Sequence, residues 1–258
     1  VIDFSDPYHQ SRPAAIASQS MAATGTPWAT QAALEILDQG GNAVDAAVAA
    51  LLGLNVTYGE AASFPGVAPV LVYDAKTGQV ESYIGAGTAP AAVTIERFQA
   101  RGWKSIPEND IWAQLIPASP DVLVALLQKH GTKSFSEVSA PAIRLAEEGF
   151  PVHYAMMHNL DLSLVERLGF TYLMPYNSQV YLNKQWWRSL QHGEVFRRPE
   201  LAQTWHLMSV AEQDAIKQGK NRQEALQAVR DEFYQGEIAK EIVDFHQQKG
   251  GLFTAQDL

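Results

Sequence analysis

The sequence predicts a helix-rich protein of mixed α and β structure, and three observations support this. Apolar residues recur at intervals of three and four in several segments, the spacing that gives a helix one buried face. Two β-rich runs flank a glycine-containing turn, as in a β-hairpin. With 258 residues, of which 47% are hydrophobic and 18% charged, the chain can bury a sizeable core. Because no internal repeat or linker divides it, we expect one domain or part of one.

The N-terminal region predicts two helices that meet at a glycine corner. Ala14–Ser18 is a weak strand candidate, and Thr26 can cap a helix that begins at Pro27. This helix should stop at Gly40-Gly41, since glycine accepts the left-handed geometry that other residues resist. Asn42 then caps a second helix. The predicted buried face of the second helix consists of Val44, Ala47, Val48, Leu51 and Leu52.

The hairpin and the later helices follow in order. Pro69–Tyr73 and Gln79–Ile84 are the hairpin strands, joined by a turn that ends in Gly78. A helix opens at Ser119 and ends at Gly131, with Leu123, Leu126 and Leu127 directed inward. From Val152 onward the chain is predicted to be mostly helical. The other predicted helices are Ala140–Glu148, Asn221–Tyr234 and Glu237–Gln248, the last with Ile238, Ile242 and Phe245 on one side.

Composition excludes several classes of function. The net charge of −9 is spread without a basic run, so nucleic acid is not expected as a partner. There are no cysteines, which excludes disulfides, thiolate nucleophiles and cysteine-ligated zinc. The most apolar window, Ala43–Val56, is too short to span a membrane, so no membrane partner is expected. Val1–Pro13 lacks the apolar core of a secretory peptide, so we expect that a leader has been removed or that the sequence begins late.

Known cofactor and metal motifs are also missing. His153 and His158 are five residues apart, whereas a zinc-protease helix places two histidines four apart. Gly85-Ala86-Gly87 resembles the start of a dinucleotide loop, but the third glycine position holds Pro90. We therefore expect no cofactor and no metal site.

Four stretches of the chain resemble, in amino-acid sequence and in order, segments of the large subunit of the γ-glutamyltransferase family. The most recognisable is Leu34–Ala50 with its Gly40-Gly41-Asn42 corner, whose small residues also suit close helix packing. The others are the Leu71–Val80 hairpin leading into Thr88–Ala92, the segment Pro141–Val152, and Phe233–Ala239 with Gly250-Gly251 and Asp257-Leu258. Because they span nearly the whole chain in the same order, coincidence is a poor explanation.

This resemblance implies an α+β fold, the four-layer αββα sandwich of N-terminal-nucleophile hydrolases. Residues 1–258 would form a single domain part, the large (α) subunit, contributing mainly helices and a β-hairpin. A second, small (β) subunit cut from the same precursor would begin with the nucleophilic Thr, whose hydroxyl attacks an amide carbonyl. No catalytic residue is then expected in this chain. The family's large subunit continues past the final Asp-Leu pair, and periplasmic or secreted location is expected because relatives are commonly exported.

The sequence departs from the family where the substrate is expected to bind. The family has an Arg three residues before the Ala-Pro pair, where it clamps the α-carboxylate of the glutamyl group; here that position is Ala86. Ala61–Pro69, which includes the wall Ser63–Pro69, stands where the family has a run of serines and glycines, and its residues are bulkier and more apolar. Ala86, its neighbours Gly85 and Gly87, and Ser63 and Phe64 are therefore the candidate substrate-binding residues. A standard γ-glutamyl donor is disfavoured, and the pocket is interpreted as suited to another acyl group of a small-molecule amide.

Two alternatives stay open at this point. Arg97, Arg101 or a residue of the second chain could replace the missing cation. The protein could also be a catalytically inactive family member that serves as a binding or structural protein. The first residue of the second chain distinguishes an active amidohydrolase or acyltransferase from this alternative.

Overall fold

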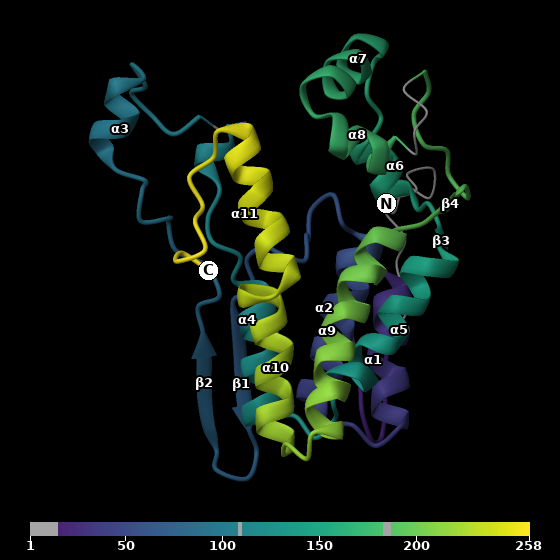
Figure 1. Ribbon diagram of the computed structural model, residues 1–258. Helices are drawn as coiled ribbons and strands as arrows, with labels where there is room; N and C mark the ends of the chain where they lie inside the picture. The colour runs from purple at the N-terminus through teal and green to yellow at the C-terminus, as the bar shows by residue number, and fades with distance from the viewer. Residues whose placement is uncertain (1–14, 108–109, 183–186) are drawn as a thin grey trace.

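The computed structural model describes residues 15–107, 110–182 and 187–258. These residues form an α+β structure in which helices predominate beside two small two-stranded sheets. Figure 1 shows a bundle that contains α1, α2, α5 and α9, with α4, α10 and a β-hairpin along one side. A lobe of short helices, α6 to α8, rises above the bundle, and an arm carrying α3 (Ile95–Ala100) projects from the hairpin side. None of the described helices is long and apolar enough to cross a membrane.

The predicted corner between the first two helices is confirmed. Helix α1 spans Pro27–Asp38 with Thr26 as its N-cap, and α2 spans Ala43–Thr57 with Asn42 as its N-cap. The two glycines between them serve different purposes. Gly40 has a φ of +80°, whereas a Cβ on Gly41 would lie 2.6 Å from the Ile36 side chain. The first allows the left-handed turn and the second the close approach of the chain to α1.

The predicted buried face of α2 is only partly correct. Val48 and Leu52 are buried, Val44 and Leu51 are half-buried, and Ala47 is exposed. The helix packs against α1, α4 and α5, so small residues on its other sides are enclosed as well. These are Ala46, Ala49, Ala50 and Gly53, where a Cβ on Gly53 would come within 3.0 Å of the α1 backbone. A helix surrounded by neighbours does not show a single apolar stripe.

The weak strand candidate at Ala14–Ser18 is wrong for the residues that the structure describes. Residues 15–18 form no strand and are exposed, and the Ile16 side chain is 92% accessible. Ala14 lies outside the described residues. Residues 15–18 pair with none of the described strands.

The predicted hairpin is confirmed as the antiparallel pair β1 (Val70–Asp74) and β2 (Gln79–Tyr83). The Asp74 side chain shapes its turn by accepting hydrogen bonds from the backbone N–H of Lys76 at 2.9 Å and the Thr77 hydroxyl at 3.0 Å. The inner face of the ribbon packs on the core, as at Val70 and Val72. The opposite face carries three exposed apolar side chains: Leu71, Tyr73 and Val80.

Helix α4 (Ser119–Lys129) is confirmed with its three leucines buried, but α5 (Phe135–Glu148) begins five residues earlier than predicted. Ser134 and Glu137 form a reciprocal capping box at its start. Pro141 lies inside the helix. A proline there removes one backbone donor, and the helix tolerates the loss because the caps and the buried face hold both ends.

The remaining elements complete the body and the lobe. The predicted late helices are confirmed as α10 (Arg222–Gln235) and α11 (Glu237–Lys249). The longest described helix, α9 (Pro199–Lys217), falls in the region predicted only as mostly helical. The short elements are η1 (Ile111–Ala113), α6 (Tyr154–Asn159), α7 (Leu164–Leu173), α8 (Pro175–Tyr181), and the paired strands β3 (Phe150–Pro151) and β4 (Val195–Phe196).

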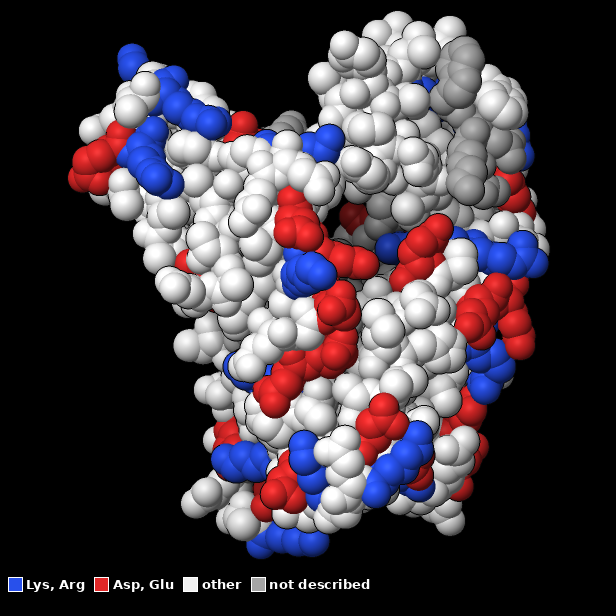
Figure 2. All heavy atoms as spheres, viewed as in Figure 1, with Lys and Arg blue, Asp and Glu red and all other residues white. Residues whose placement is uncertain are grey.

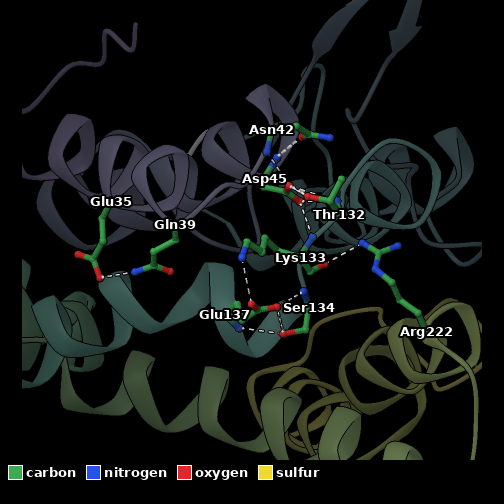
Figure 3. Close-up of polar contacts among 9 residues, drawn as sticks. All are labelled: Glu35, Gln39, Asn42, Asp45, Thr132, Lys133, Ser134, Glu137 and Arg222. Atoms are coloured by element: carbon green, nitrogen blue, oxygen red, sulfur yellow. Dashed lines mark hydrogen bonds and ion pairs between the residues drawn. The ribbon is translucent and has the colours of Figure 1, made fainter. Parts of the chain in front are cut away.

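The loop between α4 and α5, residues 130–134, is fixed by side chains from distant helices (Figure 3). The fully buried Asp45 carboxylate accepts hydrogen bonds from the backbone N–H of Asn42, Thr132 and Lys133 and from the Thr132 hydroxyl at 2.6 Å. Arg222 on α10 donates to the Leu127 and Lys133 carbonyls at 2.9 and 2.7 Å. This network joins the glycine corner and α10 to the same α4–α5 loop.

Candidate active-site groove

The segment Gly85-Ala86-Gly87 leaves β2 and is clamped between two other stretches of backbone. Gly85 has a φ of +52° and Gly87 a φ of +75°, both in the region that favours glycine. A Cβ on Gly85 would lie 2.2 Å from the Ala68 carbonyl oxygen, and a Cβ on Gly87 would lie 2.2 Å from the Ile116 carbonyl oxygen. The Ala68 N–H also donates to the Gly85 carbonyl at 2.8 Å. The segment therefore holds Ala86 in a fixed position.

The neighbouring Ser63–Pro69 wall is anchored by Phe64. Its ring is 3% exposed and meets the rings of Trp205 and Phe233 edge-on, at centroid distances of 5.5 and 5.6 Å. A tight turn follows, in which the Gly66 N–H donates to the Ser63 carbonyl at 3.0 Å. Aromatic packing and the turn together make this wall rigid.

Ser63, Phe64 and Ala86 line one groove of about 790 Å³. Gly85 and Gly87 are not part of its lining and act by positioning Ala86. The rest of the lining comes from distant parts of the chain: Pro65–Val67, Gln114–Pro117, Leu201 and Thr204 on α9, Phe233 on α10, Ile238, Glu241, Ile242, Phe245 and His246 on α11, and Phe253. Figure 2 shows the surface hollowed between α11 and the beginning of α9.

The sequence predicted the apolar side of α11, but it did not indicate that this side lines the groove. Ile238, Ile242 and Phe245 lie on one side of the helix, as predicted. Ile238 is buried, whereas Ile242 is half-buried and Phe245 is 37% exposed, because this side borders the groove. Leu201 and Thr204 had no sequence signal, since only the tertiary fold brings the start of α9 beside Ala86.

The groove is poor in positive charge. None of the described residues that line it is Lys or Arg, and Glu241 contributes a carboxylate. Figure 2 shows further acidic side chains along α10 and α11 on the same face. The proposed substitutes for the missing cation are not among the lining residues. Arg97 donates to the Ala92 carbonyl at 3.3 Å, and the Arg101 guanidinium lies 3.7 Å from the Trp112 ring centroid, within the α3 arm.

His246 is the groove's buried ionisable group. Its residue is 3% exposed, and its ring stacks on Phe253 with centroids 3.7 Å apart. Burial lowers the pKa of the imidazole below its ordinary value, because the charged form loses its hydration. The Nδ1 atom is buried without a hydrogen-bond partner. The imidazole is therefore neutral at pH 7 and adds no positive charge to the groove.

The described residues contain no group of side chains placed to hold a metal ion, and the groove hydroxyls are not hydrogen-bonded to a base. No three His, Asp or Glu side chains within the described part of the chain are placed to hold a metal ion. His153 instead caps α6 and donates through Nε2 to the Thr57 carbonyl at 2.7 Å. Of the groove hydroxyls, Thr204 donates to the Glu200 carbonyl of its own helix at 3.2 Å. The groove can bind and orient a group, but within this part of the chain no hydrogen bond links a groove hydroxyl to a base.

Comparison with known proteins gives a consistent match. The family described as Gamma-glutamyltranspeptidase matches residues 29–258. The chain is 29% identical over 255 residues to the glutathione hydrolase proenzyme of Bacillus subtilis (strain 168), an alignment that covers 97% of this chain and 39% of that protein.

Two solved structures extend the match to the fold. The cephalosporin acylase of Bacillus halodurans has a TM-score of 0.82 at 28% identity, covering 98% of this chain and 44% of that one. The γ-glutamyltranspeptidase of Helicobacter pylori has a TM-score of 0.78 at 25% identity, covering 95% of this chain and 64% of that one. The chain spans about two fifths of the length of curated relatives it matches, 38 to 39% in four of them.

Proposed function

The chain belongs to the γ-glutamyltranspeptidase (γ-glutamyltransferase) family, and on that premise we propose that it forms the large-subunit part of a self-processing amide-bond hydrolase or acyltransferase. The observation that carries the proposal is the family match over residues 29–258. Relatives named as proenzymes support processing into two chains. On the same family grounds we propose that the protein works in the periplasm or outside the cell.

We further propose that residues 1–258 form one domain part that a second chain from the same precursor completes, giving a four-layer αββα sandwich. The outer face of the hairpin supports this, because Leu71, Tyr73 and Val80 are 75%, 65% and 63% exposed. A two-stranded ribbon with one apolar face in water is only marginally stable. A sheet contributed by the second chain would cover this face and extend the ribbon.

In the proposed reaction, the nucleophile belongs to the second chain. The hydroxyl of its N-terminal Thr attacks the amide carbonyl while the α-amine of the same residue takes the proton. The amine part of the substrate leaves with a proton, and an acyl ester on the Thr remains. Water then releases the acid, or an acceptor amine takes the acyl group. The role of the described chain is to form the wall that holds the acyl group.

Processing is the first test of this proposal. The complete precursor, purified after expression, is expected to separate into two chains on a denaturing gel, and N-terminal sequencing of the smaller chain should begin with Thr or Ser. Replacing that residue by Ala should leave the precursor uncut. A precursor that stays intact and has neither residue at the junction would instead support the inactive binding or structural protein.

We also propose that Ser63, Phe64 and Ala86 form the substrate-binding wall, that Gly85 and Gly87 serve the site by holding Ala86 in place, and that the donor is not a standard γ-glutamyl compound. A guanidinium pairs with a carboxylate through two parallel hydrogen bonds, whereas the methyl group of Ala86 offers none. The groove has no Lys or Arg among its described lining residues to replace it. A glutamyl α-carboxylate would lose a charge-assisted contact of about 1.5–3 kcal/mol.

The Ala86→Arg variant tests this reading of the site. Unmodified protein is expected to turn over γ-glutamyl-p-nitroanilide poorly or not at all, and Ala86→Arg should raise kcat/KM roughly tenfold to a hundredfold. The matched control is Ala86→Met, which adds bulk without charge and should give no gain. Efficient turnover by the unmodified protein would contradict the assignment of Ala86.

A further inference from the structure

We propose that the groove beside Ala86 binds the acyl part of the amide substrate and selects acyl groups that are apolar and uncharged. The inference rests on the proposed function, since it names the substrate class of the same site. It follows from the shape of the groove, its charge and the conformation of the Ala86 segment.

The shape of the groove suits an extended apolar group. Its volume of about 790 Å³ falls within the range of roughly 300–1,000 Å³ that is typical of small-molecule sites. Phe64 forms a rigid part of the wall, because Trp205 and Phe233 hold its ring edge-on. Ile242 and Phe245 on α11 provide partly exposed apolar surface, which an aliphatic or aromatic acyl group would cover.

The charges of the groove disfavour acyl groups that end in a carboxylate. No described lining residue carries a permanent positive charge, and the neutral imidazole of His246 does not supply one at pH 7. Glu241 adds a like charge that would repel a carboxylate. An uncharged acyl group needs no cation and is not repelled by Glu241. The lining residues therefore favour binding of an uncharged acyl group over one that ends in a carboxylate.

The position of Ala86 keeps the groove open. Because Gly85 and Gly87 are pinned against the Ala68 and Ile116 carbonyls, the segment cannot swing aside to make room for a larger side chain. Because Ala86 lines the groove, a longer side chain at position 86 would occupy part of its volume. With alanine there, that space is available to the substrate.

A series of p-nitroanilide donors on the processed, complete protein tests the proposal. Hexanoyl and glutaryl donors are close in length and differ in the terminal carboxylate, and an acetyl donor reports basal turnover. We expect kcat/KM for hexanoyl to exceed that for glutaryl by about tenfold or more, and to exceed that for acetyl as well. A phenylacetyl donor should follow the hexanoyl donor.

Two single-charge variants of α11 test the groove itself. Ile242→Lys places a cation in the lining and should shift the ratio of hexanoyl to glutaryl turnover about tenfold toward glutaryl. Gln247→Lys adds the same charge to an exposed position of the same helix that does not line the groove, and the ratio should stay unchanged. If Ile242→Lys does not fold, the donor series on the unmodified protein still tests whether the groove prefers apolar, uncharged acyl groups.

The outcomes separate this inference from the proposed function. Turnover of acetyl donor with equal or greater turnover of glutaryl than of hexanoyl overturns the acyl-group assignment and leaves the amidohydrolase intact. Equal effects of the two lysine variants also overturn it. Absence of turnover with every donor, in protein that has been processed, overturns the proposed function and this inference with it.

Discussion

Replacing Asp45 by asparagine is expected to lower the free energy of unfolding by about 3–4 kcal/mol. The carboxylate is fully buried and accepts hydrogen bonds from three backbone N–H groups and the Thr132 hydroxyl. An amide of the same shape keeps one acceptor oxygen but turns an NH₂ group toward these donors, which leaves buried donors without partners. Urea denaturation followed by circular dichroism measures the loss.

The control and the pH dependence make the Asp45 prediction specific. Asp38→Asn, at an exposed position of α1, should change stability by no more than about 0.5 kcal/mol. Although burial alone would raise the pKa of Asp45, its hydrogen bonds outweigh that effect and lower the pKa. Its stabilisation is therefore present above the ordinary carboxyl pKa of about 3.9 and is lost as pH falls through the lower folded-state value. Below about pH 4 the unmodified protein should lose more stability than the variant, and parallel curves would argue against this role.

The network around Asp45 explains why the glycine corner is so recognisable. Asn42 and Asp45 cap α2 reciprocally, and the Asn42 amide donates to the His130 carbonyl at 2.6 Å. From the other side, the buried Glu212 on α9 accepts from the Phe135 and Ser136 N–H groups, both at 2.8 Å. The corner and α9 thus hold opposite ends of the same α4–α5 connection. Its residues serve the fold, while the groove lies elsewhere.

Local signals explain which elements the sequence could predict. The α1 and α2 ends were predictable because a cap and a glycine act within a few residues, and the hairpin because its turn is short. The buried face of α2 could not be predicted from the sequence, because it depends on how α1, α4 and α5 pack around the helix. The start of α5 was predicted five residues too late because the Ser134 and Glu137 capping box was not recognised in the sequence.

The groove, too, has residues that the sequence could indicate and residues that only the tertiary fold reveals. Ala86, Ser63 and Phe64 were singled out through a family resemblance, and the structure brings all three to one groove. Their relation to Thr204 and Phe253 was beyond the sequence, because those residues reach the groove through the packing of α9 and the chain after α11. The structural roles of Gly85 and Gly87 also required the backbone geometry.

The largest expected effect on the groove comes from Gly85→Ala. We expect this variant to lose about 3–4 kcal/mol of stability, because alanine resists a φ of +52° and its Cβ would lie 2.2 Å from the Ala68 carbonyl oxygen. Relief requires the segment to move and to give up the 2.8 Å hydrogen bond from Ala68. Ala86 would move with it, so turnover of the preferred amide donor should fall by about tenfold or more. Thermal denaturation and donor kinetics measure the two effects.

The variant Gly78→Ala separates the effect of the positive φ from the effect of the clash with the Ala68 carbonyl oxygen. Gly78, in the hairpin turn, has a φ of +69°, but no atom lies within 4 Å of the position of an added Cβ. The two substitutions thus share the backbone strain, which costs about 1 kcal/mol, and differ in the clash. If close approach of the Ala68 carbonyl fixes Ala86, Gly78→Ala should show only the smaller loss of stability and keep its turnover. Equal losses of stability in the two variants would mean that backbone strain alone explains the effect of Gly85→Ala. The segment carrying Ala86 could then adjust without a change in the groove.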